Sequence, residues 1–365
     1  MGLRNSAFAS INLAWKIAEN ALSLYLILTT KMKENLRFSI IVPVYNRPQE
    51  VDELLESLCR QEMKNFEVVL VEDGSAKPCT GEVEKYKDRL TIKYYFKDNS
   101  GPGLSRNYGC EKAEGNYFII LDSDCILPPH YVGAVKKALE ENYTDAYGGP
   151  DRAHASFIPI QKAINYSMTS FFTTGGIRGG GEKLDKFYPR SFNMGYSKEV
   201  FEKTGGFSKM RFGEDIDFSI RILGKGFKTK LIKDAWVYHK RRSNLRQFYK
   251  QVYNSGIARI NLMKRHPGSL KAVHALPSLF VLGHLAMIVL AVFISWLFIL
   301  PLTLHILLLF LDATFKNKSI GIGGLAIITS YFQLIGYGLG FITAFWKRII
   351  LGKDEYSAFA RNFYK

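Results

Sequence analysis

The sequence predicts a doubly wound α/β fold with a mostly parallel sheet, followed by transmembrane helices. Two observations support this fold class. Over residues 38–142, short apolar runs alternate with amphipathic helical patterns, as expected of a parallel sheet with crossover helices. Over residues 276–346, long segments carry almost no charge, as helices in a bilayer do. With 365 residues, the chain is long enough for a large globular domain and a membrane part.

Four strands are expected in the first half of the chain. Phe38–Val44 is a continuous apolar run, as a strand buried on both faces would be, and Phe66–Val71 and Tyr117–Leu121 repeat this pattern. Residues 91–96 alternate between apolar and polar side chains. The segments between them predict helices that begin at Pro48, cover 81–89 and 103–114, and follow Pro128 as far as Asn142.

The amino-acid composition changes along the whole chain and suggests five parts. They are an N-terminal amphipathic or apolar segment (1–36), an α/β domain (37–240), basic juxtamembrane interface helices (241–274), two to three transmembrane helices (275–347) and a polar tail (348–365). The first segment is broken by Lys16 and Glu19 and lacks a cleavage site, so we expect an amphipathic helix and no signal peptide. A glycine-rich loop around Arg178 is expected to be mobile and to lie near the acceptor, with an inert linker as the alternative.

The formal net charge is +16, and the position of the basic residues in the sequence indicates which class of partner they face. Residues 239–265 hold eight Lys and Arg and no acid, and the apolar region follows about ten residues later. By the positive-inside rule this indicates the cytoplasmic surface of a membrane. No recognition helix or zinc-finger spacing accompanies the charge, so no nucleic-acid partner is expected. The four scattered cysteines indicate reduced thiols.

The number of membrane crossings is left open by the sequence. Ser295, Trp296 and Pro301 divide residues 276–311 into two helices, and 320–346 forms a third apolar segment after a polar break at 312–318. Three crossings would place Lys347 and Arg348 opposite the basic stretch, which the positive-inside rule disfavours. One segment is therefore expected to be re-entrant. The alternative to membrane helices is that residues 276–346 form a buried helical domain of a soluble protein.

Polar residues collect where the predicted strands end. They are Pro43 to Arg47 after the first strand, Glu72 to Ser75 after the second, Gly101 to Asn107 at a helix start, and Asp122-Ser123-Asp124 after the fourth strand. Ligands of doubly wound sheets bind at this edge. Two acids one residue apart would be stabilised there by a divalent cation that carries a diphosphate, although Asp-Ser-Asp is also ordinary turn chemistry.

With these motifs in view, the chain resembles the family 2 glycosyltransferases, inverting enzymes with a GT-A fold whose sheet has a Rossmann-like nucleotide-binding half. The matching segments are SIIVPVYNR (39–47), VEDGS (71–75), GPGLSRNYG (101–109), IILDSD (119–124), NMGYSKEVFEKTGGF (193–207) and GEDIDFSIR (213–221). The resemblance covers about residues 38–240. The common pattern has a second Asp where this chain has Glu72.

The resemblance implies a nucleotide-sugar site and a divalent metal, Mn²⁺ or Mg²⁺. Asp73 would hold the base of the nucleotide, and Pro43, Tyr45 and Glu72 would line the same pocket. Arg106 and Asn107 begin a helix, where backbone N–H groups and a guanidinium favour phosphate. Asp124 and Asp122 would be the metal-binding pair, with Asp122 and Ser123 also near the donor. His239 resembles a third metal ligand, and a structural histidine or a phosphate contact are its alternatives.

Inverting transfer also needs a base for the acceptor hydroxyl. The resemblance assigns it to the Glu214-Asp215 pair, with Asp215 as the first choice and Asp217 as a further candidate. Helix N-termini favour acids in any case. Arg241 and Arg242 would screen the leaving diphosphate or simply face the membrane. Gln251 and Arg259 are similar to an acceptor-side motif of processive synthases, but its Arg-Trp pair is missing, which favours transfer of a single sugar.

The sequence therefore predicts an inner-membrane, multi-pass glycosyltransferase whose catalytic domain faces the cytoplasm. It would move a sugar from a nucleotide diphosphate sugar, expected to be UDP-linked, to a hydroxyl of a lipid-linked or surface glycan, in contact with membrane lipid. A polyprenyl-phosphate glycosyltransferase is one alternative. A non-catalytic component of a glycan assembly complex is another, and the intact set of acids speaks against it.

Overall fold

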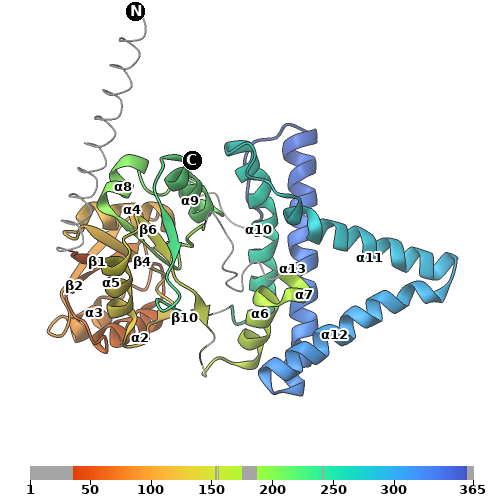
Figure 1. Cartoon of the computed structure of the whole chain (residues 1–365), viewed down its shortest axis with the longest axis horizontal. Coiled ribbons are helices and arrows are strands. Elements are labelled where there is room, and N and C mark those ends of the chain that lie inside the picture. The colour runs from red at the N-terminus through yellow and green to blue at the C-terminus, as the bar shows by residue number, and fades with distance from the viewer. Residues whose placement is uncertain (1–35, 153, 155, 175–186, 241, 360–365) are drawn as a thin grey trace, which may run out of the picture.

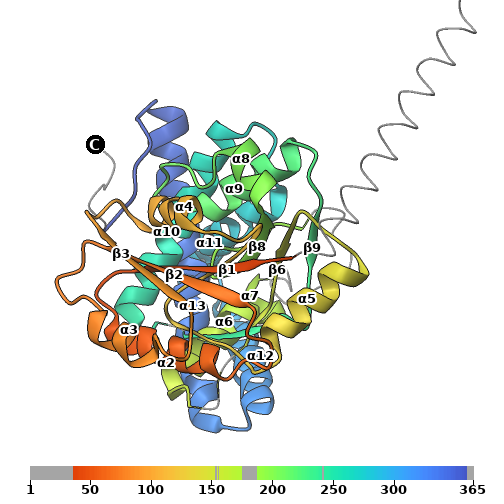
Figure 2. The same ribbon diagram turned by 90° about the vertical axis from the view of Figure 1, so that its left-hand side faces the viewer.

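A mostly parallel sheet forms the centre of the globular part in the computed structural model, which describes residues 36–152, 154, 156–174, 187–240 and 242–359. Within these residues the sheet has seven strands in the order β3-β2-β1-β4-β8-β6-β9 (Figure 2). The strands are β1 (Phe38–Val44), β2 (Phe66–Asp73), β3 (Ile92–Lys97), β4 (Tyr117–Leu121), β6 (Ala146–Gly148), β8 (Asn193–Ser197) and β9 (Thr229–Leu231). The pairs among β3, β2, β1 and β4 are parallel, and β8 runs antiparallel to both neighbours.

The order β3-β2-β1-β4 brings the carboxyl ends of β1, β2 and β4 to one edge of the sheet. All five residues of β4 are buried, because helices cover both faces of the sheet. A smaller sheet beside this edge contains β5 (Cys125–Ile126), β10 (Val237–His239) and β7 (Asp151–Arg152). The strand β5 follows Asp124 directly and pairs with β10. Residue 239 of β10 therefore lies beside the acids that follow β4.

Two apolar clusters lie on the two faces of the sheet. One joins Leu54, Val135 and Ile40, and the other joins Phe218, Cys110 and Ile41. The helices involved are α2 (Pro48–Cys59), α3 (Thr80–Tyr86) and α5 (Tyr131–Glu141) on one face, and α4 (Pro102–Lys112), α8 (Lys198–Thr204) and α9 (Glu214–Gly224) on the other. The helices therefore enclose the sheet and leave its carboxyl edge open.

The C-terminal part is helical and packs beside the α/β domain (Figure 1). It contains α10 (Leu245–Arg265), α11 (Leu276–Phe293), α12 (Leu300–Asn317) and α13 (Ile320–Phe345), and it is joined by α6 (Pro159–Thr169) and α7 (Phe171–Thr174) from the middle of the chain. Among the described residues, three segments are long and apolar enough to cross a membrane, namely Ala272–Phe293, Trp296–Asn317 and Ile320–Ile350. In Figure 1, α11 and α12 form a hairpin that points away from the sheet.

The predicted fold class is confirmed, and the strand at Tyr117–Leu121 has the predicted bounds. The polar break expected at 312–318 is shorter in the structure, because α12 continues to Asn317 and the reversal is confined to Lys318 and Ser319. Asp312 is retained in the helix through ion pairing with Lys316 and a hydrogen bond from Tyr166. The N-terminal segment, the glycine-rich loop around Arg178, and Arg241 lie outside the described residues.

Candidate active site at the carboxyl edge of the sheet

A cavity of about 470 Å³ lies between the carboxyl edge of the sheet and the helices α6, α10 and α13. Ten of the twelve residues that the sequence analysis assigned to the donor, the metal or the base line it: Pro43, Tyr45, Asp73, Arg106, Asp122, Ser123, Asp124, Glu214, Asp215 and His239. The fold thus brings together acids that lie far apart in the chain. Its remaining walls carry the basic side chains Arg47, Arg190, Arg211, Lys240, Arg242 and Arg259.

The acids after β4 form the centre of this cavity. The carboxylate of Asp124 lies 3.1 Å from Nε2 of His239 through Oδ1 and 2.5 Å from Nη1 of Arg47 through Oδ2. Asp122 Oδ2 is 3.9 Å from the same imidazole nitrogen. Phe192 stacks on His239 with ring centroids 4.8 Å apart, which fixes the plane of the imidazole. The carboxylate of Asp124, the thiol of Cys125 and the imidazole of His239 therefore lie within 4.8 Å of one another, and Asp122 approaches His239 from beside this group.

The Asp122, Asp124 and His239 set is chemically suited to a divalent cation. Burial opposes the charged form of Asp124, but His239 and Arg47 outweigh it and hold the pKa of this carboxyl well below its usual range. Carboxylate oxygens with one imidazole suit Mn²⁺. Cys125 is adjacent to Asp124 and His239, and burial raises the pKa of its thiol far above the ordinary value.

Asp73 lines the cavity at the end of β2, and both of its carboxylate oxygens accept hydrogen bonds. It accepts hydrogen bonds from the backbone N–H groups of Ser100 and Gly101, each at 2.8 Å, and from Nζ of Lys97 at 2.7 Å. Gly101 has a φ of 86°, a value that favours glycine, and it begins α4. Asp73 therefore ties the end of β2 to the first turn of α4 at the wall of the cavity.

Glu72 and Asn107 correct the sequence analysis, because neither lines the cavity. Glu72 is fully buried below it, where its carboxylate accepts from Ser75 Oγ, from Cys79 N at 2.9 Å and from Tyr94 OH at 3.2 Å. Asn107 instead holds the turn before α9, by donating to Phe207 O and accepting from Phe207 N, each at 2.8 Å. Both residues shape the walls of the cavity from behind.

Arg106 connects the two groups of acids. Its guanidinium is almost fully buried and lies 2.7 Å from Asp122 Oδ1 and 3.4 Å from Glu214 Oε1. It also packs over the ring of Phe207, with 5.1 Å between the Cζ atom and the ring centroid. This buried guanidinium bridges the acids that follow β4 and the acid pair of α9, and a guanidinium is suited to bind an anionic group such as a phosphate.

The adjacent acids Glu214 and Asp215 begin α9 and have opposite pKa shifts. Burial, together with the charge of Asp215, raises the pKa of Glu214 to about 7. Burial also works against ionised Asp215, but Arg190, whose Nε lies 2.5 Å from Asp215 Oδ2, outweighs it and lowers the pKa of Asp215. Asp215 is therefore ionised near neutral pH, in the state that a general base requires.

The further candidate Asp217 points out of the cavity. Its carboxylate accepts hydrogen bonds from Ser208 Oγ at 2.7 Å and Arg221 Nε at 3.0 Å, and it lies 2.7 Å from His266 Nε2. It therefore fastens α9 to the end of α10. Arg190 was missed by the sequence analysis, since it precedes β8 in an irregular segment and no local pattern predicts its contact with Asp215.

One face of α10 forms the side of the cavity opposite the sheet. Gln251, Ser255, Arg259 and Leu262 recur at helical spacing and all line the cavity. Ile164 and Met168 of α6 and Tyr337 of α13 complete this side. It combines apolar and basic groups and adjoins the apolar helices.

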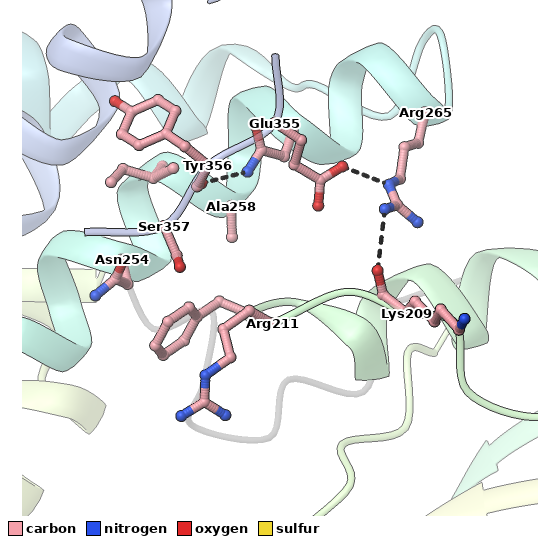
Figure 3. Close-up of a pocket in the computed structure, with 11 residues that line it drawn as sticks. Lys209, Arg211, Asn254, Ala258, Arg265, Glu355, Tyr356 and Ser357 are labelled. Atoms are coloured by element: carbon pink, nitrogen blue, oxygen red, sulfur yellow. Dashed lines mark hydrogen bonds and ion pairs between the residues drawn. The ribbon is translucent and has the colours of Figure 1, made fainter. Parts of the chain in front are cut away.

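A second, smaller cavity of about 180 Å³ lies on another face of α10 (Figure 3). Lys209, Arg211 and Phe212, which precede the acid pair, form one wall, and Glu355, Tyr356 and Ser357 of the tail form another. Arg265 joins these walls, because its Nε lies 2.8 Å from Glu355 Oε2 and its Nη2 donates to Lys209 O at 3.4 Å. Arg265 of α10 therefore links the tail to the loop that leads into α9.

Comparisons with known proteins agree with this architecture. The model of the glycosyl transferase family 2 matches residues 39–205, and that of the glycosyl transferase family group 2 matches residues 187–311. An uncharacterized glycosyltransferase of Haemophilus influenzae is 30% identical over 219 residues, which make up 57% of this chain and 70% of that protein. One from Rickettsia felis is 33% identical over 176 residues, 48% of this chain but only 28% of the relative. The chain thus spans less than a third of that relative.

A solved structure shows the same fold at low sequence identity. The mannosyltransferase PcManGT from Pyrobaculum calidifontis, in complex with GDP-Man and Mn²⁺, superimposes with a TM-score of 0.62 at 15% identity, covering 90% of this chain and 96% of that one. The arrangement of the sheet, the family models and the Haemophilus influenzae relative lead to one conclusion: this chain has the GT-A fold and belongs to glycosyl transferase family 2.

Proposed function

We propose that this protein is a membrane-anchored, metal-dependent, inverting glycosyltransferase that moves a sugar from a nucleotide sugar to the hydroxyl of a lipid-linked or surface glycan acceptor. The observation that carries the proposal is the division of one cavity between two groups of acids. Asp122, Asp124 and His239 supply ligands for a cation, and the ionised Asp215 lies beside Arg190 in the same cavity. Arg106 bridges the two groups.

The geometry supports a division of labour among these residues. When bound at Asp124, Asp122 and His239, Mn²⁺ or Mg²⁺ would neutralise the charge of the departing diphosphate. Arg106 and Arg47 would hold the same phosphates, and Asp73 with Pro43 and Tyr45 would hold the base and ribose, for which a uridine nucleotide is our first candidate. PcManGT was solved with a guanosine nucleotide sugar, so the donor screen must include both.

The transfer itself needs one proton acceptor. Asp215 would remove the proton from the acceptor hydroxyl while that oxygen forms a bond to the anomeric carbon of the sugar. The bond from this carbon to the diphosphate oxygen breaks, and the nucleoside diphosphate leaves on the opposite face. This displacement inverts the anomeric configuration.

The test is a donor screen on the purified protein that records release of nucleoside diphosphate with and without Mn²⁺. We expect one donor to be used, with activity lost in EDTA and reduced at least 100-fold in Asp215→Asn. Asp215→Asn should still bind the donor by calorimetry, since Asp215 is placed on the acceptor side. Transfer at a near-normal rate by Asp215→Asn would show that the base is assigned wrongly.

A second candidate function uses a polyprenyl phosphate as the acceptor. It is favoured by the basic groups Arg211, Arg242 and Arg259 at the side of the cavity next to the apolar helices. A phosphate nucleophile is already ionised and needs no base, so Asp215→Asn would then retain most of its activity with a polyprenyl phosphate while Arg259→Gln would lose it. The two functions are thus separated by the same pair of variants.

A further inference from the structure

We propose that α13 lies along the membrane surface, and that only the α11–α12 hairpin enters the bilayer. Both ends of α13 and the C-terminal tail then remain on the side of the catalytic domain. The partner of the exposed apolar faces of α11 and α12 is the lipid hydrocarbon. This inference concerns the membrane arrangement and does not depend on the proposed reaction.

The packing of α13 separates it from the other two apolar helices. In its most apolar stretch 44% of the residues are buried inside the protein, against 6% for α11 and 11% for α12. On the side of the catalytic domain it packs on α6, where Thr329 Oγ1 donates to Ala163 O at 3.0 Å, and on α10, where Gly340 meets the backbone of Tyr253. The helix α10 carries five Lys and Arg between Arg246 and Arg265 and no acid. A helix that runs beside it for most of its length is at the aqueous interface, because such charges are costly within hydrocarbon.

Both ends of the hairpin start from α13. At the beginning of α11, Ser278 Oγ donates to Gly338 O at 3.2 Å. At the end of α12, Phe310 and Thr314 contact Gly323, so closely that a Cβ there would lie 2.0 Å from Thr314 Oγ1. These two contacts on α13 are about 22 Å apart at 1.5 Å per residue. The hairpin therefore leaves α13 and returns to it on one side, as Figure 1 shows.

The tip of the hairpin is apolar and exposed. Phe293 is 81% exposed, Ile294 69% and Trp296 67%, although they are large apolar side chains. Ser295 satisfies the turn locally, since its backbone N–H donates to Leu290 O and its hydroxyl accepts from Leu297 N. An exposed apolar surface of this kind is stable in lipid and unstable in water.

The tail provides independent evidence for the side of the membrane. After α13 the chain runs back along α10, where Asn254 exchanges two hydrogen bonds of 2.8 Å with the backbone of Ala358, and Asn261 donates to Tyr356 O at 3.2 Å. Lys316 and Lys318 precede α13, and Lys347 and Arg348 follow it. A crossing α13 would place one basic pair on each side of the membrane, whereas a surface helix keeps both with the basic α10.

The arrangement has a consequence for the active site. Tyr337 of α13 lines the catalytic cavity together with Gln251 and Arg259 of α10. If α13 lies at the membrane surface, this side of the cavity is at the level of the lipid headgroups. The base would then reach the hydroxyl of an acceptor whose lipid part stays in the bilayer.

Depth measurements test the proposal. Single cysteines at the exposed positions Ile320, Ile328 and Phe345 of α13, and at Leu285 in α11, would carry nitroxide labels in proteoliposomes. The native cysteines at 59, 79, 110 and 125 are buried, and the unsubstituted protein measures any background labelling. We expect similar, shallow depths at the three α13 sites and a deep label at Leu285. A label at Ile328 as deep as that at Leu285, with shallow labels at Ile320 and Phe345, would overturn the proposal, because a crossing helix about 37 Å long carries its middle into the hydrocarbon.

The side of each helix end is measured separately. Lys316→Cys, Lys353→Cys and Lys137→Cys place exposed thiols before α13, after α13 and on the catalytic domain. With a membrane-impermeant maleimide we expect all three to react in inverted vesicles and none in intact cells of the expression host. If Lys316→Cys and Lys353→Cys react from opposite sides, α13 crosses the membrane and the proposal is wrong.

Discussion

Two neighbouring carboxylates at the start of α9 have different environments, and the difference supports the proposal that Asp215 is the base. Asp215 faces Arg190, which outweighs burial and keeps the carboxylate ionised. Glu214 is opposed by burial and by the charge of Asp215, and the more distant Arg106 offsets these only in part. Pairs of acids whose pKa values are pushed apart in this way are typical of acid–base sites. The base should therefore depend on a residue that contacts it, Arg190.

Replacing Arg190 with Gln should raise the pKa of Asp215, because the charge that opposes its protonation is lost. The base is active only when ionised, so the acidic limb of the kcat/KM profile should move to higher pH, by roughly one unit or more. Arg190→Lys keeps a positive charge and should restore part of the shift. An unchanged acidic limb in Arg190→Gln, with a lower rate at every pH, would mean that Arg190 only supports the fold.

Glu214 should make the stability of the metal-free protein depend on pH. Its pKa is about 7 in the folded protein against 4.5 for an ordinary Glu, so the folded state holds the extra proton between these values. The stability from this proton is fully present below about pH 4.5 and is lost as the pH rises from there through about 7, by an amount on the order of 3 kcal/mol. Glu214→Gln, which cannot ionise, should lack this loss.

The measurement is the apparent Tm in detergent with EDTA from pH 5 to 8. The difference between the unsubstituted protein and Glu214→Gln should grow with pH in favour of the variant. Glu202→Gln, at an exposed position of α8, should follow the unsubstituted protein. A constant difference across the pH range would contradict a raised pKa for Glu214.

The residue types and their spacing predicted most of the residues that line the cavity, because a motif that follows a parallel strand must lie at the carboxyl edge of the sheet. Ten predicted residues line it. Glu72 and Asn107 could not be placed from sequence, since side chains at one edge can point into a cavity or below it, and only packing decides. Arg190 and Arg47 are charged partners supplied by distant segments, and their contacts depend on the tertiary structure.

At the scale of elements, α10 joins three parts of the protein through three faces. Gln251, Ser255 and Arg259 face the catalytic cavity, and Tyr253 and Gly256 face α13. Asn254, Asn261 and Arg265 hold the tail. The sequence indicated a basic helix near a membrane but not this division, because hydrophobic periodicity identifies one apolar face and does not distinguish two polar ones.

The tail should depend on the side-chain amide of Asn254. This buried residue donates to Ala358 O and Lys250 O and accepts from Ala358 N. Asn254→Asp keeps the acceptor but turns the donor into a second acceptor against two carbonyls, at a cost of about 1–3 kcal/mol. We expect the tail after residue 351 to become sensitive to limited proteolysis. Glu355→Gln, which weakens a half-exposed ion pair, should change protection much less.

The outcome that contradicts this role is equal protection of the tail in Asn254→Asp and in the unsubstituted protein. Transfer activity should fall in Asn254→Asp as well, because the tail also contacts the loop that leads into α9 through Arg265 and Lys209 (Figure 3).

At the scale of the whole molecule, α13 is the element that connects the exposed apolar hairpin of α11 and α12 with the α/β domain. The sequence predicted three apolar segments, and the structure has them. It could not give their orientation, because an apolar composition is shared by a helix in lipid and by a helix buried between α10 and a hairpin. The glycines of α13 carry the missing information, since several meet backbone atoms of neighbouring helices while others face open space.

Matched glycine substitutions in α13 should therefore have opposite effects. A Cβ at Gly340 would lie 2.0 Å from Tyr253 O of α10, whereas a Cβ at Gly324 has no atom within 4 Å. In a helix interior, Ala is favoured over Gly by about 1 kcal/mol, so Gly324→Ala should stabilise the protein or leave it unchanged. Gly340→Ala must push α10 away from α13 and should destabilise the protein by about 1–3 kcal/mol.

Because α10 carries Gln251 and Arg259 into the cavity, Gly340→Ala should raise the KM for the acceptor several-fold while donor binding at the sheet edge is unchanged. The two variants would be compared by apparent Tm in detergent and by steady-state kinetics for each substrate. Equal effects of both variants on the acceptor KM would show that the contact between α10 and α13 does not set the acceptor side of the cavity.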